Sequence, residues 1–160
     1  MHIFFIFLTS LFIMTGCSKS TAFDPFKMDD VHERAVNNMR TATIVKNSEA
    51  KVIISAIYLN RTMPESYKDE NGEYFLVALY QKNDSNLTTE SINLTMNAYP
   101  PLTIHEVDKE DSLRSLMPIN NEWNHYYLAT YLVDEKETLS LTFESGLYGL
   151  AELTYRKDEQ

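Results

Sequence analysis

Cysteine, glycine and basic residues are all scarce in this sequence of 160 residues. The single Cys excludes an internal disulfide and a zinc site built from several cysteines. With only 4 Gly and 5 Pro, the chain is neither collagen-like nor of low complexity. The sequence has 14 basic and 23 acidic residues, which gives a formal net charge of −9. Nucleic acid is therefore not expected as a partner, because that affinity depends on neutralising phosphates with Lys and Arg.

Long hydrophobic runs are also absent, apart from one at the N-terminus. Residues 3–14 are apolar except for Thr9 and Ser10, and residues 1–16 contain no Lys, Arg, Asp or Glu. A membrane-spanning helix needs about 20 apolar residues, so this run is too short to span a membrane. It is typical of the apolar region of a secretory signal, which predicts that residues 1–16 are a signal peptide.

The four residues that follow the run, Met14-Thr15-Gly16-Cys17, resemble the lipobox of bacterial lipoproteins. The resemblance implies cleavage before Cys17 and a lipid anchor on its sulfur, with residues 17–23 as a polar tether and 24–160 as one domain. In enterobacterial lipoproteins Asp at the next position favours the inner membrane, so Ser18 favours the outer membrane. The alternative is a buried N-terminal helix in which Cys17 packs as a small apolar residue.

The first element of the expected domain is a short helix over residues 25–39. Asp24 is a good N-cap and Pro25 is favoured at the first helical position. Apolar side chains then recur at spacings of three and four, at Met28, Val31, Ala35 and Met39.

Eight later segments have the alternating or β-branched pattern of strands. They are residues 41–45, 50–59, 74–80, 92–96, 102–104, 126–133, 139–143 and 151–155. Three of them (50–59, 74–80 and 126–133) are apolar on both faces, which is typical of central strands covered above and below. Short strands separated by turn residues such as Asn71-Gly72 predict a mainly β fold, an antiparallel sandwich of about 7–8 strands. Segment 106–121 is expected to cross between the two sheets.

Strand spacing over about residues 41–156, with Leu116-x-Pro118 and Trp123 ahead of a strand, resembles the immunoglobulin-like domains of bacterial secreted proteins. The resemblance implies an immunoglobulin-like sandwich. Residues 56–60, together with Trp123 and Tyr126-Tyr127, are similar to a group of lipoproteins of Campylobacter-related bacteria. That second resemblance implies no particular activity.

Catalytic motifs are missing. The chain has no Gly-x-Ser-x-Gly elbow and no Gly-rich phosphate loop, so neither an enzyme nor a cofactor is expected. The alternative is a metal-binding protein or a hydrolase that uses His105 and the acidic segment 106–111, because an imidazole beside carboxylates can hold a metal ion. A solvated charged loop is the favoured interpretation there. His32 is expected to be a solvated surface residue, and His125 to support aromatic packing at the start of a strand.

Tyrosines are plentiful on the expected strands. They are Tyr58, Tyr74, Tyr80, Tyr126, Tyr127 and Tyr131. Core packing is the simpler explanation. The alternative is an exposed aromatic face that binds an envelope protein or a glycan. Together with the lipobox, these features predict a membrane-anchored envelope lipoprotein that acts as a non-catalytic interaction or assembly module.

One asparagine is a candidate for modification. Asp84-Ser85-Asn86-Leu87-Thr88 resembles the extended acceptor sequence of Campylobacter-type glycosylation, which makes Asn86 a candidate glycan site. A plain polar loop in an organism without the transferase is the favoured alternative.

Overall fold

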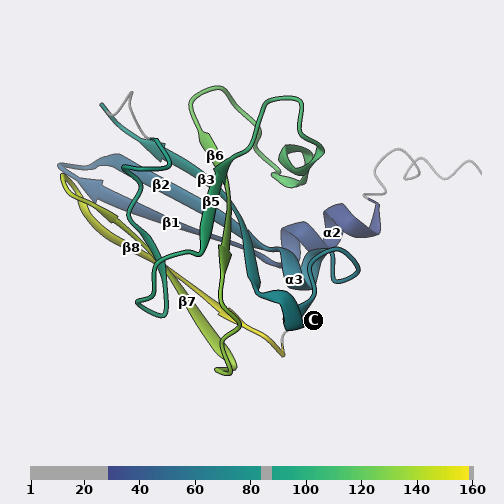
Figure 1. The fold of residues 1–160 in the computed structure, drawn as a ribbon. Helices are drawn as coiled ribbons and strands as arrows, with labels where there is room; N and C mark the ends of the chain where they lie inside the picture. Colours follow the sequence, from purple (N-terminus) through teal and green to yellow (C-terminus); the bar gives the residue numbers. More distant parts are fainter. Residues whose placement is uncertain (1–28, 84–87, 159–160) are drawn as a thin grey trace, which may run out of the picture.

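The computed structural model describes residues 29–83 and 88–158 of the chain, which form a mainly β domain (Figure 1). Its helical elements are α2 (Asp30–Asn37), the single turn α3 (Leu59–Thr62) and two 3-10 turns, η3 (Asp69–Asn71) and η4 (Ser112–Leu116). The strands are β1 (Met39–Lys46), β2 (Glu49–Tyr58), β3 (Glu73–Gln81), β4 (Leu94–Met96), β5 (Thr103–Glu106), β6 (His125–Tyr131), β7 (Thr138–Ser145) and β8 (Gly149–Arg156).

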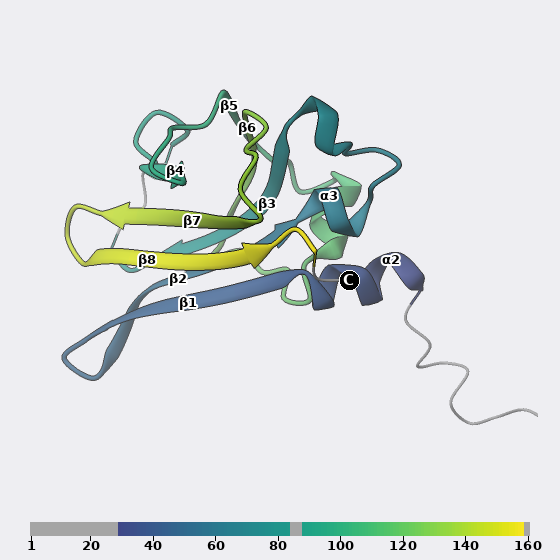
Figure 2. The ribbon, with the colours of Figure 1, turned by 90° about the horizontal axis from the view of Figure 1, so that it is seen from below.

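These strands form two antiparallel sheets. One has the order β1-β2-β3-β6-β5 and the other the order β4-β7-β8. Figure 2 shows β8 lying beside β1, so these two edge strands close one side of the sandwich. The predicted mainly β class and the two-sheet antiparallel architecture are confirmed.

The inner core lies between the two sheets. Alternate side chains of β2, β3 and β6 face the apolar sides of β4, β7 and β8. Aromatic rings pack at its centre. The ring centroids of Tyr58 and Tyr155 each lie 5.1 Å from that of Phe75. Ile54 and Val77, in the middle of the two most apolar segments, are both fully buried.

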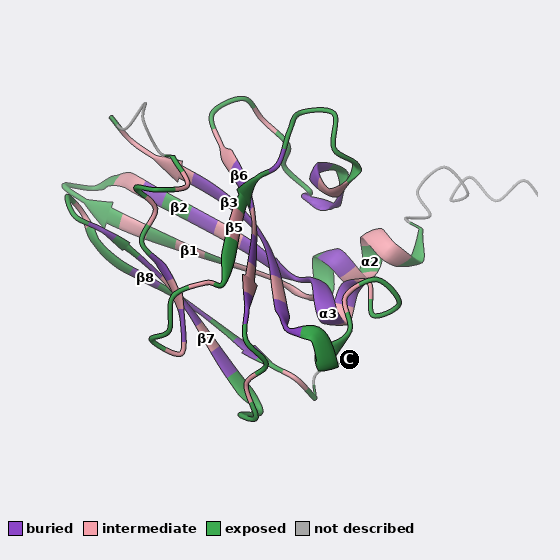
Figure 3. Ribbon diagram, viewed as in Figure 1, coloured by how far each residue is buried: buried purple, intermediate pink, exposed green. Residues whose placement is uncertain are grey.

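The outer face of the five-stranded sheet has its own cover. Ile57 and Leu76 point away from the other sheet and are buried against Ala35 of α2 and against Val107 and Leu116. Figure 3 shows β2 and β3 buried along much of their length, while β1 and β5 carry more exposed residues. The prediction that the central strands are covered on both faces is confirmed for β3, for β6 and for residues 56–58 of β2, whereas Ile53 of β2 is 37% exposed on the outer face.

The predicted path of segment 106–121 is wrong. β5 and β6 are antiparallel neighbours in the same sheet, so the chain between them does not cross the sandwich. It lies over the outer face of the sheet because Val107, Leu116 and Met117 are apolar and bury themselves there.

Within the described residues the N-terminal helix is shorter at both ends than the prediction of 25–39, because α2 begins only at Asp30, after Asp29 in an extended conformation. α2 ends at Asn37, because Met39 already belongs to β1. Asp29 caps α2, and its carboxylate accepts a hydrogen bond from the His32 backbone N–H at 2.9 Å. The predicted start at Pro25 lies outside the described residues.

Two strands end earlier than predicted. β2 ends at Tyr58, and Leu59 starts α3. β6 ends at Tyr131, whose partner Glu73 is the first residue of β3, so the ladder has no further partner on that side. Leu132 and Val133 were expected in the strand, but they lie beyond it and are exposed.

Candidate functional site

His105 and the acidic segment after it do not converge on a metal site in the described part of the chain. His105 lies on the edge strand β5, opposite Leu128 of β6, and is exposed. Asp111 caps η4 by accepting a hydrogen bond from the Leu113 N–H at 2.9 Å. No three His, Cys, Asp or Glu side chains within residues 29–83 and 88–158 are grouped to hold a metal ion.

His32 has a contact that the sequence did not predict. Its Nδ1 lies 2.8 Å from Asp29 Oδ1, and its Nε2 lies 3.1 Å from the Ser115 carbonyl oxygen. The hydrogen bond with the Asp29 carboxylate is the main cause that raises the pKa of His32 above its ordinary value. The hydrogen bond from the His32 backbone N–H, followed by that from its imidazole, lowers the pKa of Asp29. His32 thereby ties α2 to η4 across the outer face of the sheet.

Most of the strand tyrosines belong to the core, which confirms the simpler explanation. Those buried are Tyr58, Tyr126, Tyr127 and Tyr131, whereas Tyr74 and Tyr80 are half-buried. The Tyr126 hydroxyl donates to the Ile119 carbonyl at 3.2 Å and so fixes the loop before β6. His125 stacks on Tyr127, with the ring centroids 6.4 Å apart.

Exposed apolar side chains gather where the chain leaves β4 and β6. Tyr99, Leu102, Leu132 and Val133 are 69%, 56%, 69% and 49% exposed. The Leu102 N–H donates to the Thr130 carbonyl at 2.7 Å, which places Leu102 beside the end of β6. We call these four residues the edge surface.

The edge surface borders a groove of about 480 Å³, called here the edge groove. Its lining includes Met96, Pro100, Tyr131, Leu132, Val133, Asp134 and Lys136. The Tyr131 hydroxyl is buried and has no hydrogen-bond partner among residues 29–83 and 88–158, and burial raises its pKa. Buried hydroxyls without a partner are uncommon in folded proteins. The edge surface and the edge groove are therefore the strongest candidate for a binding site on this side of the domain.

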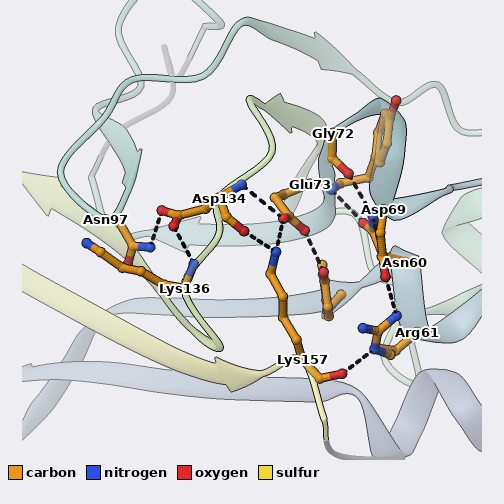
Figure 4. Close-up of polar contacts among 11 residues, drawn as sticks. Asn60, Arg61, Asp69, Gly72, Glu73, Asn97, Asp134, Lys136 and Lys157 are labelled. Atoms are coloured by element: carbon orange, nitrogen blue, oxygen red, sulfur yellow. Dashed lines mark hydrogen bonds and ion pairs between the residues drawn. The ribbon is translucent and has the colours of Figure 1, made fainter.

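A buried carboxylate organises the same end of the sandwich (Figure 4). Glu73 is fully buried, and its Oε2 accepts a hydrogen bond from the Tyr58 hydroxyl at 2.5 Å. Its Oε1 accepts from Lys157 Nζ and, at 3.3 Å, from the Asp134 N–H. Burial, followed by the bond to Glu73, raises the pKa of Tyr58, so its hydroxyl stays protonated and donates. This network joins β3, the β6–β7 connection and the residues after β8.

The turn before Glu73 is held by Asn60 and Gly72. The Asn60 amide donates to the Gly72 carbonyl at 2.7 Å and accepts from the Tyr74 N–H at 2.8 Å. Gly72 has a φ of +146°, and a Cβ there would lie 2.7 Å from the Tyr131 carbonyl oxygen, so only glycine fits. The Asn71-Gly72 pair is thus a turn, as predicted: Asn71 ends η3, and Gly72 is its C-cap and leads directly into β3.

Two predicted sites, the lipidated Cys17 and the glycan acceptor Asn86, lie outside the described residues and stay predictions. Within residues 29–83 and 88–158 no helix is both long and apolar enough to span a membrane. No protein-family model, no curated protein and no solved structure matches this chain.

Proposed function

We propose that this protein is an envelope lipoprotein, anchored through Cys17 to the outer membrane, whose domain acts as a non-catalytic interaction module. The lipobox resemblance of Met14-Thr15-Gly16-Cys17 supports the anchor. The first described residue, Asp29, follows Cys17 by 29 − 17 = 12 residues. Twelve residues span at most about 43 Å when fully extended, so the domain would work close to the membrane surface.

The edge surface is the single observation that carries the interaction role. Three of its large apolar side chains, Tyr99, Leu132 and Val133, are exposed and line one groove, and Leu102 is exposed beside the end of β6. Contiguous exposed apolar patches on a soluble domain mark interaction sites. Apolar or aromatic groups that insert into a groove supply most of the affinity at such sites. The partner would therefore be an envelope protein or a glycan that inserts such a group into the edge groove.

Hydrogen bonds hold one wall of the edge groove in place. The Asp134 carboxylate accepts from Asn97 Nδ2 at 2.6 Å and from the Lys136 N–H at 2.9 Å. These two bonds, the first above all, lower the pKa of Asp134. Asn97 in turn accepts from the Ser140 N–H at 2.9 Å, which links the wall to β7. A wall fixed in this way favours binding, because its side chains lose little conformational entropy when a partner binds.

Site-specific crosslinking tests the interaction role. A photoreactive residue at Leu132 should give a discrete crosslinked product in intact membranes, and the product should decrease strongly in a Val133→Asp background. A photoreactive residue at Thr154, which is exposed on β8 away from the groove, is the matched control and should not give that product. The same product from both positions, or none from Leu132, would contradict the role.

Fractionation tests the anchor separately. Cys17→Ser removes the sulfur that would carry the lipid, so this variant should leave the membrane fraction. Unchanged membrane attachment of Cys17→Ser would contradict the anchor without touching the interaction role.

A further inference from the structure

A second hollow lies at the helical end of the domain, away from the edge groove. It is a cleft of about 520 Å³ between α2, α3 and the residues after β8, lined by Arg34, Asn37, Asn60, Arg61, Lys157 and Asp158. Three of these side chains are cationic and one is anionic, in a chain whose formal charge is −9. The cleft thus concentrates positive charge on an acidic protein.

Backbone carbonyls orient the two guanidinium groups. Arg34 Nε donates to the Thr62 carbonyl at 2.9 Å, and Arg61 Nε donates to the Lys157 carbonyl at 2.6 Å. Each guanidinium is therefore held by its Nε, which leaves the terminal amino groups to make other contacts. Within residues 29–83 and 88–158, the terminal amino groups of Arg34 have no hydrogen-bond or ion-pair partner. One terminal amino group of Arg61 forms an ion pair with the Asp69 carboxylate, at 2.9 Å.

The other charged groups at the cleft are already engaged. Asp158 accepts two hydrogen bonds from Arg156, at 3.1 and 2.8 Å. Lys157 Nζ is bound to the buried Glu73 (Figure 4). The Asp158 carboxylate is consequently neutralised by Arg156, and among residues 29–83 and 88–158 the guanidinium of Arg34 has no acidic partner at the cleft.

We propose that this cleft binds a small ligand through an oxyanion group, a phosphate or a carboxylate, with Arg34 as the main contact. The planar guanidinium fork matches two oxygens of such a group and forms strong charge-assisted hydrogen bonds. The volume of the cleft falls within the range of small-molecule sites, so it has room for a ligand larger than the bare ion. This cleft is separate from the edge surface, and its binding of an anion does not depend on the proposed anchor.

Anion titration of the unlipidated mature chain tests the proposal. Residues 17–160 carrying Cys17→Ser are titrated with inorganic phosphate, and separately with acetate, at constant ionic strength. Backbone amides of residues 34–38 and of Arg61, followed by NMR, should shift along a saturable curve with at least one of the two anions. Arg34→Gln should weaken the affinity about tenfold or more, because the fork is lost. Lys46→Gln removes the same charge at the exposed far end of β1 and should leave the affinity unchanged.

Arg34→Lys keeps the charge but lacks the guanidinium fork, so this variant should bind the anion more weakly than the native chain. It replaces Arg34→Gln in the test if Arg34→Gln does not fold. Vesicles of phosphatidylglycerol, compared with phosphatidylcholine, identify the source of the anion. Binding to phosphatidylglycerol vesicles that is lost in Arg34→Gln assigns the site to a lipid headgroup. Binding of the soluble anion without binding to these vesicles assigns the site to a soluble ligand. The absence of a saturable shift with either anion, or equal affinities in the native chain and Arg34→Gln, would overturn the proposal.

Discussion

The two faces of the five-stranded sheet are buried in different ways. The inner face packs against three regular strands, and the outer face packs against α2, η4 and irregular chain. β3 shows the contrast within one strand, since Leu79 belongs to the inner core and Leu76 to the outer one, and both are fully buried. A strand sequence therefore reveals that both faces are covered, but not what covers them.

The largest expected effect comes from truncating these two leucines. Leu79→Ala should lower the free energy of unfolding by about 3–5 kcal/mol, because regular strands on both sides cannot collapse into the cavity. Leu76→Ala should cost about 2–3 kcal/mol, because the irregular cover can relax toward the sheet. Urea denaturation of both variants measures the difference.

Equal losses for the two leucines would mean that the outer cover is as rigid as a sheet. A loss below about 0.5 kcal/mol for Leu76→Ala, typical of a surface position, would mean that the outer cover is not packed at all.

A smaller effect is expected from Arg114, which holds the outer cover. Its guanidinium lies 4.0 Å from the centroid of the Tyr126 ring, and its Nη2 donates to Asn120 at 2.9 Å. Its buried Nε has no partner among the described residues, which offsets part of this gain. Arg114→Met keeps an apolar stem and should cost about 1 kcal/mol. Hydrogen exchange should quicken in 107–124 and stay unchanged in β7 and β8, and a uniform change over both sheets would contradict this assignment.

The smallest expected effect is the pH dependence of the contact between α2 and η4. The folded state raises the pKa of His32. The contribution of His32 to the stability of the fold is therefore fully present below the unfolded pKa of about 6.5, and it is lost as pH rises through the raised pKa. The folded state lowers the pKa of Asp29, so the contribution of Asp29 is present above about 3.9 and is lost as pH falls through the lowered value.

The stability difference between the native chain and His32→Gln should therefore be greatest at mildly acidic pH and shrink above neutrality. Thermal unfolding across this range measures it. A difference that grows above pH 7 would reverse the sign of the linkage, and a flat profile would mean that His32 does not contribute.

Local periodicity accounts for what could be predicted. The alternation of Leu139, Leu141 and Phe143 with polar residues placed β7 and its buried face correctly. Segment 107–124 has no such period, and it is held by isolated side chains such as Arg114, so its path could not be inferred from spacing. The predicted strand end at Val133 was wrong because the pairing of β6 stops where β3 begins, and that partner is fixed by tertiary structure.

The candidate sites were harder to predict for the same reason. Lys157 reaches Glu73 across 84 positions of the chain, and Arg34 and Arg61 meet at one cleft although 27 positions separate them, since 61 − 34 = 27. The only local signal was a charged Glu73 at the head of an apolar strand. The edge surface was missed because Leu132 and Val133 continue an apolar run and so resemble core residues.

The intact mass of the native protein, extracted from membranes with detergent, tests whether Cys17 carries the proposed lipid anchor. If Cys17 carries the anchor, the extracted chain begins at Cys17 and has the additional mass of a diacylglycerol and any further acyl chain. A chain that keeps residues 1–16, or one that begins at Cys17 without lipid and is recovered in the soluble fraction, would contradict the anchor.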